Sequence, residues 1–141
     1  MSYYNYSSIY NFRTTQENFN PPLSPQSKDA PESKDPSVWG PHAWKFLHIM
    51  AENYPQNPCP LVRSKAKQFI NALPFMLPCE TCSVHAMAFI DEHNAELDTI
   101  VSSRDTLANF FVKFHNYVNQ RYGKKVYSTP FDIKQIRSLY K

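Results

Sequence analysis

The stretch from Leu77 to Ile90, LPCETCSVHAMAFI, contains the residues with the clearest chemical potential in this sequence. It places Cys79 and Cys82 three residues apart, and His85 follows three residues later. This spacing suits a redox-active dithiol, part of a metal site, or two buried thiols without a chemical role. The surrounding sequence has to decide among these three interpretations.

The position of Cys79 favours a reactive thiolate. Because Pro78 suits the first turn of a helix, the sequence predicts a helix start near Cys79, where unpaired N–H groups and the helix dipole stabilise an anion. The thiolate is the form of cysteine that attacks disulfides. We expect Cys82 one turn further into the helix, shielded by other helices but close enough to form a disulfide with Cys79. An exposed and a shielded sulfur are what a dithiol redox centre needs.

Other uses of the cysteine pair fit less well. A thioredoxin-like site would follow a strand, and attached haem would need a histidine directly after the second cysteine, where a serine stands. Zinc is the main rival, because Cys79, Cys82 and His85 could supply three ligands. Cys59 or His48 could then supply the fourth. Structural zinc usually serves domains with poor cores, so redox chemistry is favoured, with a zinc-stapled adaptor or inert thiols as alternatives.

The composition predicts a single all-α domain. A chain of 141 residues with 42% hydrophobic content can build one core. Its two glycines are too few for a hairpin-rich β fold. The net charge of +3 is scattered, which disfavours nucleic acid as a partner. No apolar run reaches about 18 residues and no leader pattern is present, so we expect no membrane span, no signal peptide and a cytoplasmic location.

Residues 1–37 and 38–141 differ in composition. The first segment is rich in Pro, Ser, Lys and Asp and poor in Leu, Ile and Val, so we expect a flexible N-terminal tail. The second segment shows apolar residues at helical spacing between prolines, serines and a glycine. Its short connections favour a four-helix bundle with a short fifth helix.

Each expected helix has its own boundary signals and apolar stripe. Prolines mark the expected helix starts and ends in the first half of this domain, and Gly123 marks a helix end in the second half. The expected buried stripes include Leu61, Val84, Tyr122 and Leu139. The second expected helix begins at Pro60 and is closed by Pro74 and Pro78. The other expected helices run from Pro41 to about Pro55, Pro78 or Cys79 to Ile90, Ser102 or Ser103 to Tyr122, and onward from Pro130.

Two of the expected helices carry a histidine on their apolar stripe. A lone histidine there, such as His48 or His115, is ordinarily a hydrogen-bonded core residue. In the segment FFVKFHNYVNQRYGK, however, Asn119 lies one turn after His115 and Phe111 one turn before it. Polar groups among aromatic rings suit a flat heterocycle, and Lys124 at the helix end could meet a phosphate. A flavin fits this description and can pass electrons from a dithiol to oxygen.

Three blocks of sequence together resemble the Erv/ALR family of FAD-dependent sulfhydryl oxidases. The likeness covers roughly residues 39 to 128, and each block alone would be weak evidence. The compact chain looks most like the short enzymes of large cytoplasmic DNA viruses. The blocks are WGPHAWKFLHIMAENYP (39–55), FINALPFMLPCETCSVH (69–85) and FHNYVNQRYGK (114–124).

The resemblance implies a helical bundle that holds FAD, usually as a homodimer. Such an enzyme oxidises protein dithiols to disulfides and passes the electrons to molecular oxygen, giving hydrogen peroxide. By position, Cys79 looks like the thiol that meets the substrate and Cys82 like the thiol beside the flavin. The implied FAD-contacting residues are Gly40, Trp44, His48, Tyr54, His85, Phe111, His115, Asn116, Asn119 and Lys124, with no metal.

The chain departs from the family pattern in its other cysteines. Cellular members often have a structural disulfide where this chain has Val112 and about Ser128. Members also commonly carry a second, shuttling cysteine pair, whereas only Cys59 is left over here. We therefore expect direct exchange with a separate dithiol protein or a small thioredoxin-like carrier. For a viral enzyme, the location would be the host cytoplasm or the virion, where disulfide formation must oppose glutathione.

Overall fold

The computed structural model describes residues 34–140. The expected flexible tail, residues 1–37, lies almost wholly outside the described residues. Within them every regular element is a helix, so the expected all-α class is confirmed. None of these helices is both long enough and apolar enough to cross a membrane.

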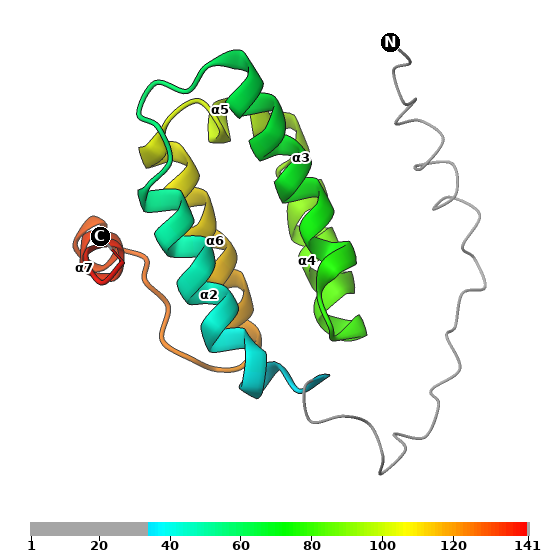
Figure 1. The fold of residues 1–141 in the computed structure, drawn as a ribbon. Helices are drawn as coiled ribbons and strands as arrows, with labels where there is room; N and C mark the ends of the chain where they lie inside the picture. Colours follow the sequence, from blue (N-terminus) through cyan, green and yellow to red (C-terminus); the bar gives the residue numbers. More distant parts are fainter. Residues whose placement is uncertain (1–33, 141) are drawn as a thin grey trace. The chain divides into compact units, whose positions relative to one another are not determined.

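Four long helices form the bundle: α2 (Pro36–Glu52), α3 (Pro60–Met76), α4 (Glu80–Glu92) and α6 (Arg104–Arg121). They alternate in direction, with α2 beside α6 and α3 beside α4 (Figure 1). The short helix α5 (Leu97–Ile100), after a 3-10 turn at Asn94–Glu96, lies at one end of the bundle, and the corner between α3 and α4 lies at the opposite end. Helix α7 (Pro130–Ser138) is the expected fifth helix and packs beside α6.

The first helix begins five residues earlier than expected. The sequence predicted a start at Pro41, but α2 starts at Pro36, where the Asp35 carboxylate caps it by accepting a hydrogen bond from the Ser37 N–H at 2.8 Å. Pro41 lies inside the second turn, where it removes one intrahelical hydrogen bond. Gly40 makes this possible, because a side chain before a proline would clash with the proline ring in a helical conformation.

Other boundary signals worked as expected, with one exception. Ser103 caps α6 in a reciprocal pair with Thr106, and Gly123 follows α6 with a positive φ of 61°. Pro74 and Pro78 were expected to close the second helix; α3 continues past Pro74 and ends at Met76, before Pro78. Pro74 lies in the last turn of α3 and is fully buried.

The core runs along the centre of the bundle. Phe111, Ile70, Leu107 and Val101 are fully buried, and Phe89 stacks on Phe114 with 4.8 Å between ring centroids. Four residues that were expected on buried stripes are instead mostly exposed, because they lie at helix ends or on the solvent side of their helix. These are Leu61 (66% exposed), Val84 (59%), Tyr122 (58%) and Leu139 (71%).

Candidate active site

Cys79 and Cys82 form a disulfide at the start of α4. Cys79 is the N-cap residue with an extended backbone, and Cys82 lies in the first turn, so their Cα atoms are 5.1 Å apart. The Cys82 N–H donates to the Cys79 sulfur at 3.2 Å, as the N–H groups of a first turn do to an N-cap side chain. Both cysteines are partly exposed, so the expected division into an exposed Cys79 and a shielded Cys82 is not found. The expected placement of Cys79 at a helix start is therefore found.

The corner that carries this disulfide is tied to both helices. Leu77 and Pro78 connect α3 to Cys79, and the Ser83 hydroxyl in the first turn of α4 donates to the Pro74 carbonyl of α3. The Ser83 N–H also donates to the Cys79 carbonyl at 2.9 Å. These contacts fix the direction in which the two sulfur atoms face.

His48 of α2 and His115 of α6 meet across the bundle. The His48 Nε2 and His115 Nδ1 atoms are 3.0 Å apart, so one ring donates a hydrogen bond and the other accepts it. Trp44 stacks on His115, with ring centroids 4.2 Å apart and planes 8° from parallel. Tyr140, which follows α7, stacks on the His48 ring at 4.7 Å. Both stripe histidines thus lie inside the bundle, but their contact with each other and the position of Tyr140 carried no sequence signal that we recognised.

Both histidines are held in the neutral form. Burial lowers the pKa of His48 to about 4, although the charge of Glu52 opposes this. Burial also lowers the pKa of His115 to about 4; the charge of Lys124, and that of His48 when it is protonated, lower it further. At neutral pH the pair therefore offers one shared hydrogen bond and no charge.

The amides of Asn116 and Asn119 shape the loop after α6. The Asn116 side chain both donates to the Tyr127 carbonyl, at 2.7 Å, and accepts from the Tyr127 N–H, at 2.9 Å. The Asn119 amide donates to the Lys125 carbonyl at 2.9 Å. Asn116 and Asn119 were predicted to contact the cofactor, and in this structure their side chains form hydrogen bonds with the loop backbone. Lys124 lies in the same loop and is exposed.

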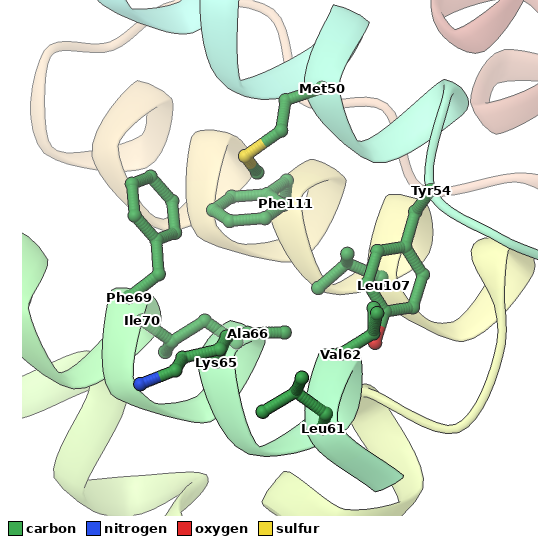
Figure 2. Close-up of a pocket in the computed structure, with 10 residues that line it drawn as sticks. All are labelled: Met50, Tyr54, Leu61, Val62, Lys65, Ala66, Phe69, Ile70, Leu107 and Phe111. Carbon is green, nitrogen blue, oxygen red and sulfur yellow. The ribbon is translucent and has the colours of Figure 1, made fainter. Parts of the chain in front are cut away.

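A cavity of about 370 Å³ lies between α2, α3 and α6 (Figure 2). The rings of Tyr54, Phe69 and Phe111 face it, so two predicted contact residues line it and Phe69 is an addition. The Tyr54 hydroxyl donates to the buried Val101 carbonyl at 3.0 Å, which leaves only the ring to line the cavity. The lining residues are Met50, Tyr54, Leu61, Val62, Lys65, Ala66, Phe69, Ile70, Leu107 and Phe111.

The remaining predicted positions lie apart from the cavity lining. Gly40 is buried in α2, yet a Cβ built on it would have no atom within 4 Å apart from its chain neighbours and its own helix backbone. His85 lies one turn after Cys82 on α4, where burial and the nearby Arg121 lower its pKa. Cys59 is exposed, unpaired with another cysteine, and caps α3 without a side-chain hydrogen bond.

An ion-pair network that the sequence did not reveal joins α7 to α2 and α6. Glu52, one turn after His48 on α2, is only 8% exposed and pairs with Arg137 of α7. Arg137 also binds the Asp105 carboxylate at 2.9 Å. The sequence feature that could have indicated this network is Glu52, a glutamate on an otherwise apolar helix face, because a buried carboxylate requires a charged partner.

The zinc alternative has no support in the described part of the chain. Cys79 and Cys82 are bonded to each other, and residues 34–140 contain no group of three or more His, Cys, Asp or Glu side chains placed to hold a metal ion.

Fold and site together define an all-α protein that carries a Cys-x-x-Cys disulfide and a histidine–aromatic cluster. The chain belongs to the Erv1 / Alr family, whose model matches residues 41–140. The resemblance to this family predicted from the three sequence blocks, and to its viral members, is confirmed.

Relatives of this chain occur in viruses and in cells. A protein of Invertebrate iridescent virus 6, whose name assigns it as an FAD-linked sulfhydryl oxidase, is 42% identical over 93 residues, or 64% of this chain and 84% of the relative. The mitochondrial FAD-linked sulfhydryl oxidase erv1 of Schizosaccharomyces pombe is 30% identical over 115 residues, or 82% of this chain and 62% of the relative. The crystal structure of the FAD binding domain of Erv1 from Saccharomyces cerevisiae matches with a TM-score of 0.65 at 27% identity, covering 76% of this chain and 98% of that one.

Proposed function

We propose that this chain is an FAD-linked thiol oxidase that forms disulfide bonds in protein dithiols through Cys79 and Cys82. The observation that carries the proposal is the disulfide at the start of α4, with one sulfur at the N-cap and both partly exposed. The relatives named above are FAD-linked sulfhydryl oxidases by name.

The residues present fit an FAD molecule. The cavity has an apolar lining and a volume at the lower end of the range for small-molecule sites, so it suits a flat apolar ring system but not a whole dinucleotide. The polar part would therefore extend outside it, where His48 and His115 offer hydrogen-bonding edges and Lys124 a positive charge. Gly40 leaves open space in α2. We assign contacts with FAD to Gly40, Trp44, His48, Tyr54, His85, Phe111, His115 and Lys124, with Asn116 and Asn119 shaping the loop that carries Lys124.

The reaction begins when a substrate thiolate attacks the sulfur of Cys79. A bond forms between the substrate sulfur and Cys79, the bond between Cys79 and Cys82 breaks, and Cys82 leaves as a thiolate with the electron pair. The second substrate thiolate then attacks the substrate sulfur of this mixed disulfide and releases Cys79 as a thiolate. Two electrons have passed to the cysteine pair, two protons have passed to solvent, and the substrate leaves as a disulfide.

The start of α4 favours the release of Cys79. The Cys82 N–H that donates to the Cys79 sulfur, together with the helix dipole, stabilises negative charge on that sulfur. A stabilised thiolate is a better leaving group, so the mixed disulfide resolves faster. When bound, FAD supplies a two-electron acceptor that molecular oxygen reoxidises, with hydrogen peroxide as product.

The partners follow from this chemistry. The substrate is a protein dithiol or a small thioredoxin-like carrier, and molecular oxygen is the final acceptor. The likeness to Erv1 core structures supports a homodimer, and the viral relatives support a role in the host cytoplasm or the virion.

The visible absorption spectrum tests the proposal. The purified protein should show a flavin band that bleaches on addition of dithiothreitol and recovers under air as the thiol is consumed. A protein that stays colourless after refolding with FAD would contradict the proposal.

A pair of cysteine variants tests the role of the disulfide. Cys82→Ser should lose turnover with dithiothreitol by at least about a hundredfold and keep its FAD, because the disulfide can no longer form. Cys59→Ser is the matched control, since Cys59 is exposed and free, and it should retain turnover. Equal turnover in the two variants would contradict the assignment.

A further inference from the structure

Ser83 connects the two helices that meet at the disulfide. Its N–H donates to the Cys79 carbonyl at 2.9 Å and closes the first turn of α4. Its hydroxyl donates to the Pro74 carbonyl in the last turn of α3. Ser83 directly follows Cys82, and neither bond involves a sulfur atom. Both donors of this one residue therefore fix the start of α4, where the two cysteines lie.

The Ser83 hydroxyl takes the place of a backbone donor that the sequence lacks. In a continuing helix the Pro74 carbonyl would accept a hydrogen bond from the N–H four residues later, but that residue is Pro78, which has no N–H. Pro74 is fully buried, so an unpaired carbonyl there would be unfavourable. The hydroxyl thus joins the end of α3 to the turn of α4 that carries Cys82.

We propose that Ser83 is a positioning residue for the redox pair: it keeps Cys79 and Cys82 at disulfide-bonding distance after the disulfide has been reduced. The two Cα atoms are 5.1 Å apart, inside the usual range of about 4.4–6.8 Å for bonded cysteines. The hydrogen bonds of Ser83 do not depend on the bond between the sulfur atoms, so they hold this spacing in the dithiol. The inference rests on the proposed function, because it concerns the cysteines assigned to thiol exchange.

Holding the two thiols together favours the disulfide. The positioned dithiol has less conformational freedom to lose when the bond between the sulfur atoms forms again, so the equilibrium shifts toward the oxidised pair. This shift lowers the reduction potential, and a pair with a lower potential passes its two electrons more readily to an acceptor. Ser83 therefore acts on the second half of the reaction, after the substrate has left as a disulfide.

A redox titration with glutathione tests this role. Two molecules of glutathione give two electrons and two protons to the pair, which becomes the dithiol, and they leave as glutathione disulfide. The titration uses the whole chain with bound FAD under nitrogen. Every sample carries Cys59→Ser, so that alkylation counts only Cys79 and Cys82. Ser83→Ala should shift the equilibrium toward the dithiol by about three- to tenfold, as expected for one hydrogen bond, which corresponds to about 15–30 mV.

Two further variants separate positioning from a general loss of stability. Ser83→Thr keeps a hydroxyl at this place and should stay within about twofold of the wild-type equilibrium constant. Ser102→Ala is the matched control, because the Ser102 hydroxyl also donates to a backbone carbonyl, that of Thr99 at 2.7 Å. Ser102 follows α5, at the opposite end of the bundle from the disulfide (Figure 1). Its replacement should leave the equilibrium of the cysteine pair unchanged.

Three results would overturn the proposal. These are a wild-type equilibrium constant for Ser83→Ala, an equal shift in Ser102→Ala, and a shift in Ser83→Thr as large as that in Ser83→Ala. In each case the hydroxyl would not position the pair. The titration counts thiols and needs no turnover with oxygen. Wild-type protein that fails to oxidise dithiothreitol in air would instead contradict the thiol oxidase function, so the two failures are distinguishable.

Discussion

Acidification between pH 7.5 and 5.0 should destabilise the protein through the His48–His115 pair. Burial lowers the pKa of each ring from its ordinary 6.5 to about 4 in the folded state. In this window the unfolded chain therefore binds more protons than the folded one, and stability falls as the pH falls. With these values each histidine lowers the free energy of unfolding by about 2 kcal/mol between pH 7.5 and pH 5.0. The pair together lowers it by about 4 kcal/mol.

The window separates the histidines from the carboxylates. The lowered pKa of His85 adds to the decrease in stability in the same window, but this addition is common to wild-type protein and the variants. The pKa values of Asp35, Asp105 and Asp132 are also lowered, by hydrogen bonds to Ser37, Arg137 and Thr129 respectively. These carboxylates contribute their full stabilisation at pH values above 3.8, their pKa in the unfolded chain. The stabilisation is lost mainly below pH 5, as the pH falls through the lowered pKa values of the folded state. A loss of about 4 kcal/mol is large beside the 5–15 kcal/mol that is typical of folded domains.

Urea unfolding at fixed protein and FAD concentrations, at pH 7.5, 6.5, 5.5 and 5.0, measures this effect. His48→Gln should lose roughly half of the pH-dependent decrease, because one buried neutral ring has been removed. His42→Gln is the matched control, since His42 is an exposed histidine on the same helix. The reasoning is refuted if wild-type protein and His48→Gln show the same decrease in unfolding free energy between pH 7.5 and 5.0.

Three further variants probe the contacts that surround the site. Arg137→Met should cost about 3–5 kcal/mol of unfolding free energy, because it leaves the buried Glu52 carboxylate unpaired; a loss below about 1 kcal/mol in urea unfolding would show that the pair is not buried in solution. Asn116→Ala should cost about 2 kcal/mol and weaken FAD binding in a fluorescence titration, because two hydrogen bonds to the Tyr127 backbone are lost; unchanged stability would contradict this. Tyr54→Phe should lower the unfolding free energy by about 1–3 kcal/mol while its ring still lines the cavity, and unaltered thermal unfolding would argue against its buried hydrogen bond.

Local sequence signals predicted most helix boundaries in this chain. Pro60, Ser103 and Gly123 act through the few residues beside them, so their effects could be read without the fold. The error at Pro41 arose because the Asp35 cap starts α2 at Pro36, which places Pro41 inside the helix, and Pro74 likewise lies inside α3 rather than at its end. The short helix α5 was missed because four residues are too few to show a period.

The candidate site was predictable wherever its residues lie on one helix. Cys79 and Cys82 are joined by helical spacing after a proline, so their disulfide follows from local geometry. His48 and His115 each lie on an apolar stripe, which indicated that both face the interior of the bundle. Their roles in binding FAD stay predictions of the family resemblance.

The sequence alone determined the four long helices and α7, the redox-competent cysteine spacing and the family of the chain, because these depend on residues close together or on shared motifs. Only the tertiary structure decided which residues from distant segments meet. Arg137 reaches Glu52 across 85 positions of sequence, and Tyr140 covers His48 from beyond the last helix. Periodicity reports which face of a helix is buried, but it does not report which other helix covers that face. The packing of the bundle therefore set the polar partners and the environment that keeps both histidines neutral.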